Sequence, residues 1–513
     1  MNRFVERFTS SIVTALGCFD RVIFKGYLPL RSEGQLNAFV DHGLKIRRKD
    51  FLPFVERQSQ TLVEYAQNLA QLGGVPYLHL RGVHSKEKIV RELLQQRPTG
   101  EGLVAVLCAM ETCRTVKLLH GQQRPRLVFA PRPQRVLYCY FLDPELGLIH
   151  VRLQTWFPFT TQVYVNGHDW LARQLQQHRL GFVQLDNAFT QLDDPQQAQA
   201  LADRFPKLPW TAILQGLARR CNPLLSQPWL GGGRYYWVID QAEYSTDVLF
   251  RAREQLALLY PRLLEHACLH FAATDILTFL GRRLHPCFDG EVLTTCKKDR
   301  LPGARIKHRV QNNWLKMYDK FGLLLRIETV INQPRAFKVR RWCTRQGRRQ
   351  LLWLPMNKGV ANFYRYREVA QASNARYLEA LSVVEPLPAT AQELDRLSKP
   401  VRFRQRRRRA LNLLSPADLE LFRAVLLGQH RLHGLRNRDV AEHLFARPAA
   451  NRQEARRRRT RVSRLLQLLC AHGLLAKIPR THRYRVTAQG ETLMGAVLYV
   501  RYKALTRELQ EAA

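Results

Sequence analysis

Three carboxylates lie close together near the middle of the 513-residue chain, in the segment IDQAEYSTDVLF. Asp240, Glu243 and Asp247 have the three- and four-residue spacing that places side chains on one face of a helix. Clustered carboxylates bind Mg²⁺ or Mn²⁺, and such an ion activates water and offsets charge during phosphodiester cleavage. We therefore predict a metal-binding catalytic site that contains these residues. The alternative is an ordinary acidic turn at the start of a helix.

Glu328 is a fourth candidate catalytic residue, in the otherwise apolar and basic strand LRIETV. Its carboxylate either forms an ion pair with Arg326 or Lys316 or is a metal ligand that faces nucleic acid. Three more aspartates lie beside predicted strands and would complete such a site: Asp20, Asp143 and Asp186.

Other chemistries lack part of their sequence signature. Tyr318 and Tyr244 are candidate covalent nucleophiles, but the His-hydrophobic-His metal motif that usually accompanies such tyrosines is absent. The segment His266-Ala-Cys268-Leu-His270 has no CxxC pair beside it, so buried helix residues explain it more simply than a zinc site. The sequence contains no Walker or Rossmann fingerprint and therefore gives no support for ATP dependence.

The positive charge of the chain is concentrated in two zones. Lys and Arg number 81 against 42 Asp and Glu, a formal charge of +39. Residues 297–349 have 16 basic and 3 acidic residues, and residues 401–513 have 25 and 8. Nucleic-acid phosphate is the commonest intracellular polyanion, so both zones predict binding to nucleic acid, either DNA or RNA. The alternative is a solvated basic surface that aids solubility.

The first zone alternates cations with aromatic residues. Aromatic rings that stack on bases beside cations that contact phosphates are suited to single-strand binding, although a basic sheet with core aromatics has the same composition. The candidate nucleic-acid-binding residues here are Lys307, Arg309, Trp314, Lys316, Lys320, Arg340 and Arg341.

The second zone predicts three helices followed by a basic hairpin. The segment Ser415-Pro416-Ala417-Asp418 is a helix start, and further helices are expected at 437–445 and 452–472. This order resembles a winged helix, and residues 473–490 resemble the wing of MarR-like bacterial regulators. In a winged helix the third helix enters a major groove and the wing contacts phosphate or the minor groove. A winged helix used for protein contact is the alternative. The candidate binding residues are Arg406, Arg407, Arg456, Arg457, Arg461, Arg480, His482, Arg483 and Arg485.

The elements that must position the acids belong to an α+β fold. Strands at 136–143, 148–156 and 160–166, a helix at 167–177 and a short strand just before Asp186 form the order that opens an RNase H-like domain, although many α+β folds share it. Elsewhere we expect two short strands within 12–29, helices at 50–72, 85–97 and 358–382, and strands within 304–342. The predicted fold class is a body of mixed sheet and helices, RNase H-like in its order of elements, followed by a winged-helix domain.

Composition shifts suggest five consecutive segments. An N-terminal α/β region (1–130) precedes a central α+β domain with the candidate acidic site (131–300) and a basic β-rich region with a helix (301–385). A linker (386–414) with prolines and the run Arg406–Arg409 leads to the winged-helix domain (415–513).

Composition also excludes several protein classes. A hydrophobic content of 46% argues against wholesale disorder, and no apolar run approaches the ~18 residues that a membrane-spanning helix needs. The charged N-terminus lacks an apolar h-region, and the ten cysteines are scattered without a framework. We expect a soluble cytoplasmic protein with reduced thiols and no membrane partner; a homo-oligomer is compatible with the sequence.

The segments 141–175, 237–250 and 305–341 resemble a bacterial family usually left as hypothetical or labelled transposase-like, and the similarity covers most of the chain. The resemblance implies an association with mobile DNA and assigns no catalytic residue. We therefore expect a DNA-binding protein of a mobile genetic element, a transposase- or nuclease-like enzyme that uses a carboxylate-bound divalent metal for phosphodiester cleavage or strand transfer. The alternative is a non-catalytic DNA- or RNA-binding protein, either a winged-helix regulator or an RNA partner.

Overall fold

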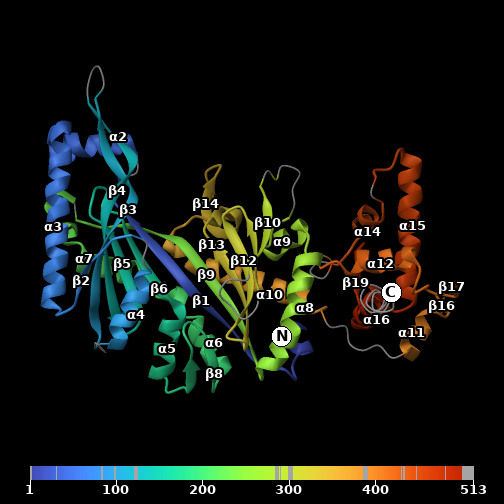
Figure 1. Cartoon of the computed structure of the whole chain (residues 1–513). Helices are drawn as coiled ribbons and strands as arrows, with labels where there is room; N and C mark the ends of the chain where they lie inside the picture. Colours follow the sequence, from blue (N-terminus) through green and yellow to red (C-terminus); the bar gives the residue numbers. More distant parts are fainter. Residues whose placement is uncertain are drawn as a thin grey trace. The chain divides into compact units, whose positions relative to one another are not determined.

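The computed structural model confirms the mixed α+β class (Figure 1). The chain divides into two compact units: a sheet unit (residues 13–251 and 311–372) and a terminal unit (residues 1–12, 252–310 and 373–513). The five predicted segment boundaries and the RNase H-like arrangement stay predictions. The structure describes residues 3–30, 32–82, 85–96, 100–120, 125–230, 232–283, 288, 290–297, 304–384, 391–428, 430, 434–445, 447–479 and 481–499.

A large sheet organises the sheet unit. Its strands follow the spatial order β12-β13-β9-β1-β6-β5-β4-β3-β2. The β2–β3 pair is parallel, whereas the pairs β3–β4, β4–β5, β5–β6, β1–β6, β9–β13 and β12–β13 are antiparallel. The bounds are β1 (Ile12–Tyr27), β2 (Tyr77–Leu80), β3 (Gly102–Leu119), β4 (Arg126–Asp143), β5 (Gly147–Gln154), β6 (Thr161–Asn166), β9 (Tyr236–Phe250), β12 (Asn313–Lys320) and β13 (Leu324–Ile331).

Helices and hairpins accompany this sheet. An aromatic core that includes Phe19, Phe24, Trp210 and Phe363 packs between β1 and the neighbouring helices. The other elements of the unit are α2 (Glu33–Ala38), α3 (Phe51–Leu72), α4 (Lys86–Gln96), α5 (Gly167–Gln177), α6 (Pro195–Ala202), α7 (Trp210–Cys221), and the hairpins β7 (Phe182–Gln184) with β8 (Phe189–Leu192) and β14 (Lys338–Arg345) with β15 (Arg348–Pro355).

A glycine lets β1 and β9 approach closely. A Cβ atom on Gly17 would lie 2.4 Å from the hydroxyl oxygen of Tyr244, so a larger residue would displace this buried ring. Gln199 of α6 holds the same glycine, because its side chain accepts from the Gly17 N–H (2.8 Å) and donates to the Gly17 carbonyl (3.0 Å). These contacts fix β1 just before the acidic residue Asp20.

Two predictions from the sequence are wrong at the level of secondary structure. Residues 12–27 form one long strand instead of two, and residues 236–250 form β9, so Asp240, Glu243 and Asp247 do not lie on a helix. β9 is rich in aromatic and β-branched residues, which favour a central strand over a helix. Side chains alternate along a strand, so Glu243 and Asp247 share one face of the sheet and Asp240 lies on the other.

The terminal unit contains a helical part and a C-terminal module. The predicted order of three helices, a hairpin and a final helix is confirmed in the module, while its assignment as a winged helix stays a prediction. A short helix and a short hairpin occupy part of the predicted linker. The bounds are α1 (Arg3–Arg7), α8 (Arg253–His270), α9 (Ala273–Phe279), β10 (Val292–Lys297), β11 (Arg305–Val310), α10 (Phe363–Leu381, which begins in the sheet unit), α11 (Ala391–Leu397), β16 (Val401–Phe403), β17 (Arg406–Arg408), α12 (Pro416–Leu426), α14 (Asn437–Leu444), α15 (Arg452–Ala471), β18 (Leu475–Lys477), β19 (Tyr484–Val486) and α16 (Ala488–Tyr499).

The C-terminal module has its own hydrophobic core. Leucines of α12 and α15 pack with residues of α14 and α16 in one buried cluster, which includes Leu419, Val440, Leu466 and Met494. None of the helices in the described part of the chain combines the length and apolar character that crossing a bilayer requires.

Candidate active site

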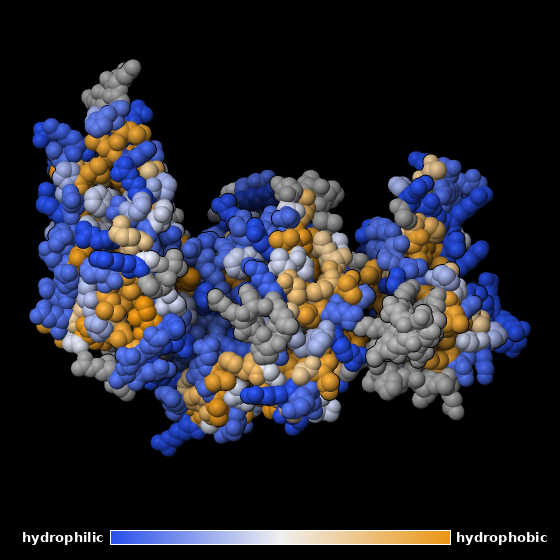
Figure 2. Space-filling model, in the orientation of Figure 1, coloured by the Kyte–Doolittle hydropathy of each residue, from blue (hydrophilic) through white to orange (hydrophobic). Residues whose placement is uncertain are grey.

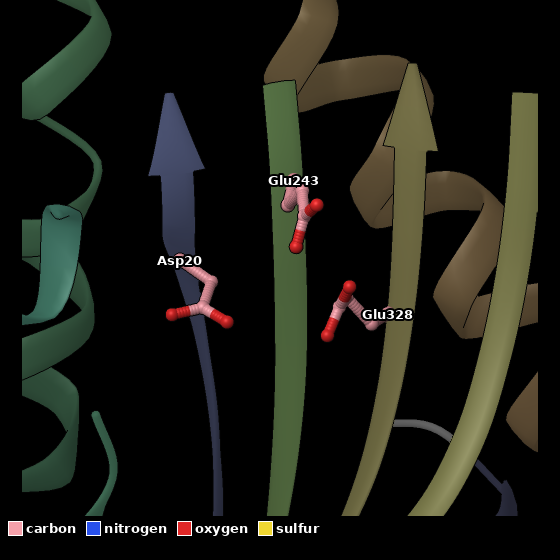
Figure 3. A group of neighbouring side chains, drawn as sticks. All are labelled: Asp20, Glu243 and Glu328. Atoms are coloured by element: carbon pink, nitrogen blue, oxygen red, sulfur yellow. The ribbon is translucent and has the colours of Figure 1, made fainter. Parts of the chain in front are cut away.

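Three carboxylates from neighbouring strands converge on one point of the large sheet. Asp20 of β1, Glu243 of β9 and Glu328 of β13 point toward one another (Figure 3), and one oxygen atom of each lies within 4.8 Å of the others. The three residues are 7%, 6% and 1% exposed. Three carboxylates at this separation, each with a lone pair to offer, form a possible oxygen-ligand set for a divalent cation.

The alternation of strand side chains produces this convergence. Arg326 and Glu328 occupy alternate positions of β13, opposite Asp247 and Ser245 of β9, while Glu243 lies opposite Val330. On the other side of β13, Lys316 of β12 lies opposite Glu328. The charged face of three adjacent strands is therefore set by register rather than by sequence proximity.

Arg326 is fully buried and bridges three parts of the site. Its guanidinium donates to both Asp247 oxygens (2.6 Å each), to Asp20 Oδ2 (3.3 Å) and to the Asn187 carbonyl (2.6 Å). Burial disfavours the charged forms of Arg326 and Asp247, but the ion pair between them more than offsets this penalty. The pKa of Arg326 lies well above its usual value, and the pKa of Asp247 is lowered to about 2.

His168 connects the two aspartates from the side of α5. Its Nδ1 lies 3.5 Å from Asp20 Oδ1, and its Nε2 lies 3.8 Å from Asp247 Oδ2 and 3.5 Å from the Ser245 hydroxyl. Burial opposes protonation, yet the contacts with the aspartates raise the pKa of His168 above its usual value. The order Ser245–His168–Asp20 is that of a nucleophilic triad, but Ser245 and His168 are fully buried, so we assign them a structural role.

The carboxylate of Glu328 is held by Lys316 and Tyr318. Lys316 Nζ forms a short ion pair with Glu328 Oε1, and the Tyr318 hydroxyl donates to Glu328 Oε2 at 2.7 Å. Burial alone would raise the pKa of Glu328, but Lys316 lowers it below its usual value. Glu328 therefore pairs with Lys316, one of the two partners expected from the sequence, and its carboxylate is also one of the three in the triad.

Glu243 is the acid of the triad that resists ionisation. Burial and repulsion from Glu328 raise its pKa to about 7, although Lys316, 3.6 Å away, and Arg21 act in the opposite direction. Gln241 donates to Glu243 Oε1 at 2.5 Å. At neutral pH Glu243 is partly protonated, so a cation that binds there would displace a proton.

The charges of the site suit a divalent ion. The triad and Asp247 are four carboxyl groups that lie close to Arg326, Lys316 and His168. The raised pKa of His168 favours its charged form, and the raised pKa of Glu243 favours its neutral form. A divalent cation bound to the triad would take the place of the proton on Glu243, with the oxygen ligands that Mg²⁺ and Mn²⁺ favour.

The remaining acids predicted from the sequence lie outside the triad. Asp240 Oδ1 accepts from Lys358 at 3.1 Å on the other face of β9. Asp143 caps the turn after β4, and Asp186 pairs with Lys320 and Arg91. Of the three metal ligands predicted within β9, only Glu243 belongs to the triad. Asp247 lies next to the triad and is paired with Arg326.

The predicted nucleic-acid-binding residues differ in their exposure to solvent. Lys316 and Lys320 are part of the buried charge network, and Trp314 and Lys307 are half-buried. The exposed ones are Arg309, Arg340, Arg341, Arg406, Arg407, Arg456, Arg457, Arg461, His482 and Arg485, while Arg483 is half-buried and Arg480 lies outside the described residues.

Sequence reasoning missed the roles of Arg326, His168 and Asn187. An arginine inside an apolar strand is a usable signal, because a buried guanidinium requires carboxylate partners on adjacent strands. His168 and Asn187 gave no comparable signal, since their roles depend on how α5 and the β7–β8 hairpin pack beside β1.

Comparisons with protein-family models, curated proteins and solved structures found no match for this chain.

We predict that Arg326→Met destabilises the protein by about 3–5 kcal/mol, because it leaves Asp20 and Asp247 buried without their cation. Arg91→Met is the matched control: Arg91 is about half exposed, and its pairs with Glu87 and Asp186 should contribute about 1 kcal/mol or less. Urea unfolding measures both changes. Equal losses in the two variants would contradict a central role for Arg326.

Glu243 should make stability depend on pH. The folded protein keeps a proton on Glu243 up to pH of about 7, whereas an unfolded glutamate loses it near about 4.3. Wild type should therefore lose stability relative to Glu243→Gln as pH rises through this window, by up to about 3 kcal/mol. Urea unfolding of both proteins at about pH 5 and about pH 8 measures the difference. A difference that does not change with pH would contradict the raised pKa.

Proposed function

We propose that the protein is a DNA-binding, metal-dependent phosphodiesterase of the transposase or nuclease type, in which Asp20, Glu243 and Glu328 hold Mg²⁺ or Mn²⁺. The observation that carries this proposal is the convergence of the three carboxylates from β1, β9 and β13. The proposal retains the RNase H-like interpretation of the body, whose basis is the order of elements in the sequence, and the association with mobile DNA that the family resemblance implies.

The side chains around the triad have complementary parts to play. A bound ion would supply Lewis acidity and lower the pKa of a coordinated water. Glu243 would give up its proton as the ion binds, and the ion would take over from Lys316 the compensation of the Glu328 charge. Lys316, released from Glu328, would then be a cation available to a phosphate. Arg326 and His168 hold Asp20 in a fixed orientation throughout.

Two features of the C-terminal module support a role in duplex binding. Arg456, Arg457 and Arg461 are exposed on α15, and the visible surface near the upper end of this helix is mostly hydrophilic (Figure 2). A groove of about 550 Å³ lies between α14 and α15. Five arginines and one histidine line it: Arg436, Arg438, Arg447, Arg458, Arg459 and His482. We infer a winged helix whose third helix, α15, enters the major groove while these residues contact phosphates.

A non-catalytic nucleic-acid-binding protein is the second candidate function. The observation that favours it is that the triad already has cationic partners: Lys316 pairs with Glu328, and Arg326 pairs with Asp20. A network of this kind is complete without a metal ion and would serve to hold the central strands together.

The two functions differ in their response to metal and to single substitutions. Purified protein should nick plasmid DNA with Mg²⁺ or Mn²⁺, and Glu243→Gln or Glu328→Gln should lower the rate at least about 100-fold while DNA binding persists. Gel-based nicking assays and electrophoretic mobility shifts measure cleavage and binding separately.

Asp240→Asn is the matched control for these variants, because Asp240 pairs with Lys358 on the other face of β9 and should be dispensable for cleavage.

Replacing Arg456, Arg457 and Arg461 with Ala should weaken DNA binding and flatten its salt dependence. Cleavage that survives both glutamate substitutions would reject the triad. Wild-type protein that binds DNA but leaves it intact with either metal would favour the non-catalytic function.

A further inference from the structure

The β14–β15 hairpin, residues 338–355, is a basic ribbon that presents aromatic rings to solvent. The ribbon contains six Lys and Arg residues and no Asp or Glu. Trp342 is 58% exposed and Trp353 is 54% exposed. Trp342 belongs to the basic zone 297–349, whose composition fits either base stacking or a basic core, and its ring, like that of Trp353 just beyond the zone, lies outside the core.

The register of the hairpin places both tryptophans on one face. Trp342 lies opposite Leu351, and Trp353 lies opposite Arg340. Directly opposed residues of an antiparallel pair share a face, so the two tryptophans are diagonal neighbours with Arg340 beside them. Diagonal neighbours lie about 7–8 Å apart, close enough for successive nucleotides of one strand to reach both rings.

Cations hold both rings in place. The Arg349 guanidinium lies over the Trp342 ring at 5.3 Å, and the Arg365 guanidinium lies over the Trp353 ring at 5.2 Å. Arg365 is itself fixed, because it donates to the Lys338 carbonyl (2.9 Å) and to Glu368 (2.7 Å). The aromatic face is therefore arranged before any partner binds, with guanidinium groups beside each ring.

We propose that this ribbon is a stacking platform for single-stranded nucleic acid, in which bases stack on Trp342 and Trp353 and the neighbouring arginines contact phosphates. Positive charge without any acidic residue complements a polyanion, and exposed indoles complement unpaired bases, whose flat faces are accessible only outside a duplex. An acidic protein surface would satisfy the charge but would leave both indoles without a stacking partner.

This inference rests on the proposed nucleic-acid binding and extends it to strandedness. The triad and the C-terminal module require only phosphodiester and duplex DNA, whereas the ribbon requires unpaired bases. Together with the proposed cleavage activity, the ribbon would favour DNA substrates that have an unpaired segment.

The test compares binding to a labelled oligothymidylate of about 20 nucleotides and to a duplex of similar length by fluorescence anisotropy. The double variant Trp342→Ala/Trp353→Ala should bind the single strand about tenfold or more weakly than wild type and should bind the duplex unchanged. The variant Trp342→Phe/Trp353→Phe keeps a ring at each position and should retain most of the affinity. Both sites are exposed, and thermal unfolding checks that the fold is intact.

Leu72→Ala is the matched control, because Leu72 is an apolar side chain at the end of α3 that is 88% exposed. Unchanged single-strand affinity in the double Ala variant, with binding that still depends on α15, would overturn the ribbon and leave the proposed function in place. Wild-type protein that binds neither oligonucleotide would overturn both. Tryptophan-dependent binding to phosphatidylserine vesicles without single-strand binding would assign the ribbon to a membrane surface instead.

Discussion

The ion pair between Arg326 and Asp247 is the interaction on which the rest of the sheet unit depends. A guanidinium with no solvent exposure carries a large desolvation penalty, which only a full set of acceptors can offset. Asp247, Asp20 and the Asn187 carbonyl supply those acceptors from β9, β1 and the β7–β8 hairpin. Any shift in register would leave a buried charge without a partner, so this pair selects one alignment of the central strands.

That alignment has a consequence for the neighbouring acids. Once β9 and β13 are in register, Glu243 and Glu328 are brought close together, and repulsion between them adds to the burial that raises the pKa of Glu243 to about 7. Lys316 relieves only part of this repulsion. The same network that makes the fold specific therefore brings together the carboxylates of the proposed metal site and keeps a proton on one of them.

The sequence predicted the element order well where periodicity was strong. The helices near 50–72 and 167–177, the strands of residues 304–342 and the helix-hairpin order of the C-terminal module are all present. The acidic site was predicted only in part, because a three- and four-residue spacing was interpreted as helical although the segment lies in β9. Residues far apart in the sequence, such as Asp20 and Glu328, come close only when β1, β9 and β13 are aligned in one register, and the local sequence does not specify this register. The exposure of Trp342 and Trp353 has a different cause, because it depends on whether other elements cover the β14–β15 hairpin.

The metal-binding role of the triad can be tested by crystallography of the protein soaked with Mn²⁺, because anomalous scattering locates the ion independently of any activity. We expect one Mn²⁺ within about 2.1 Å of oxygen atoms from Asp20, Glu243 and Glu328, with Lys316 displaced from Glu328. A structure at saturating Mn²⁺ in which Lys316 still pairs with Glu328 and no ion contacts the triad would exclude metal binding there and leave the carboxylates with a purely structural role.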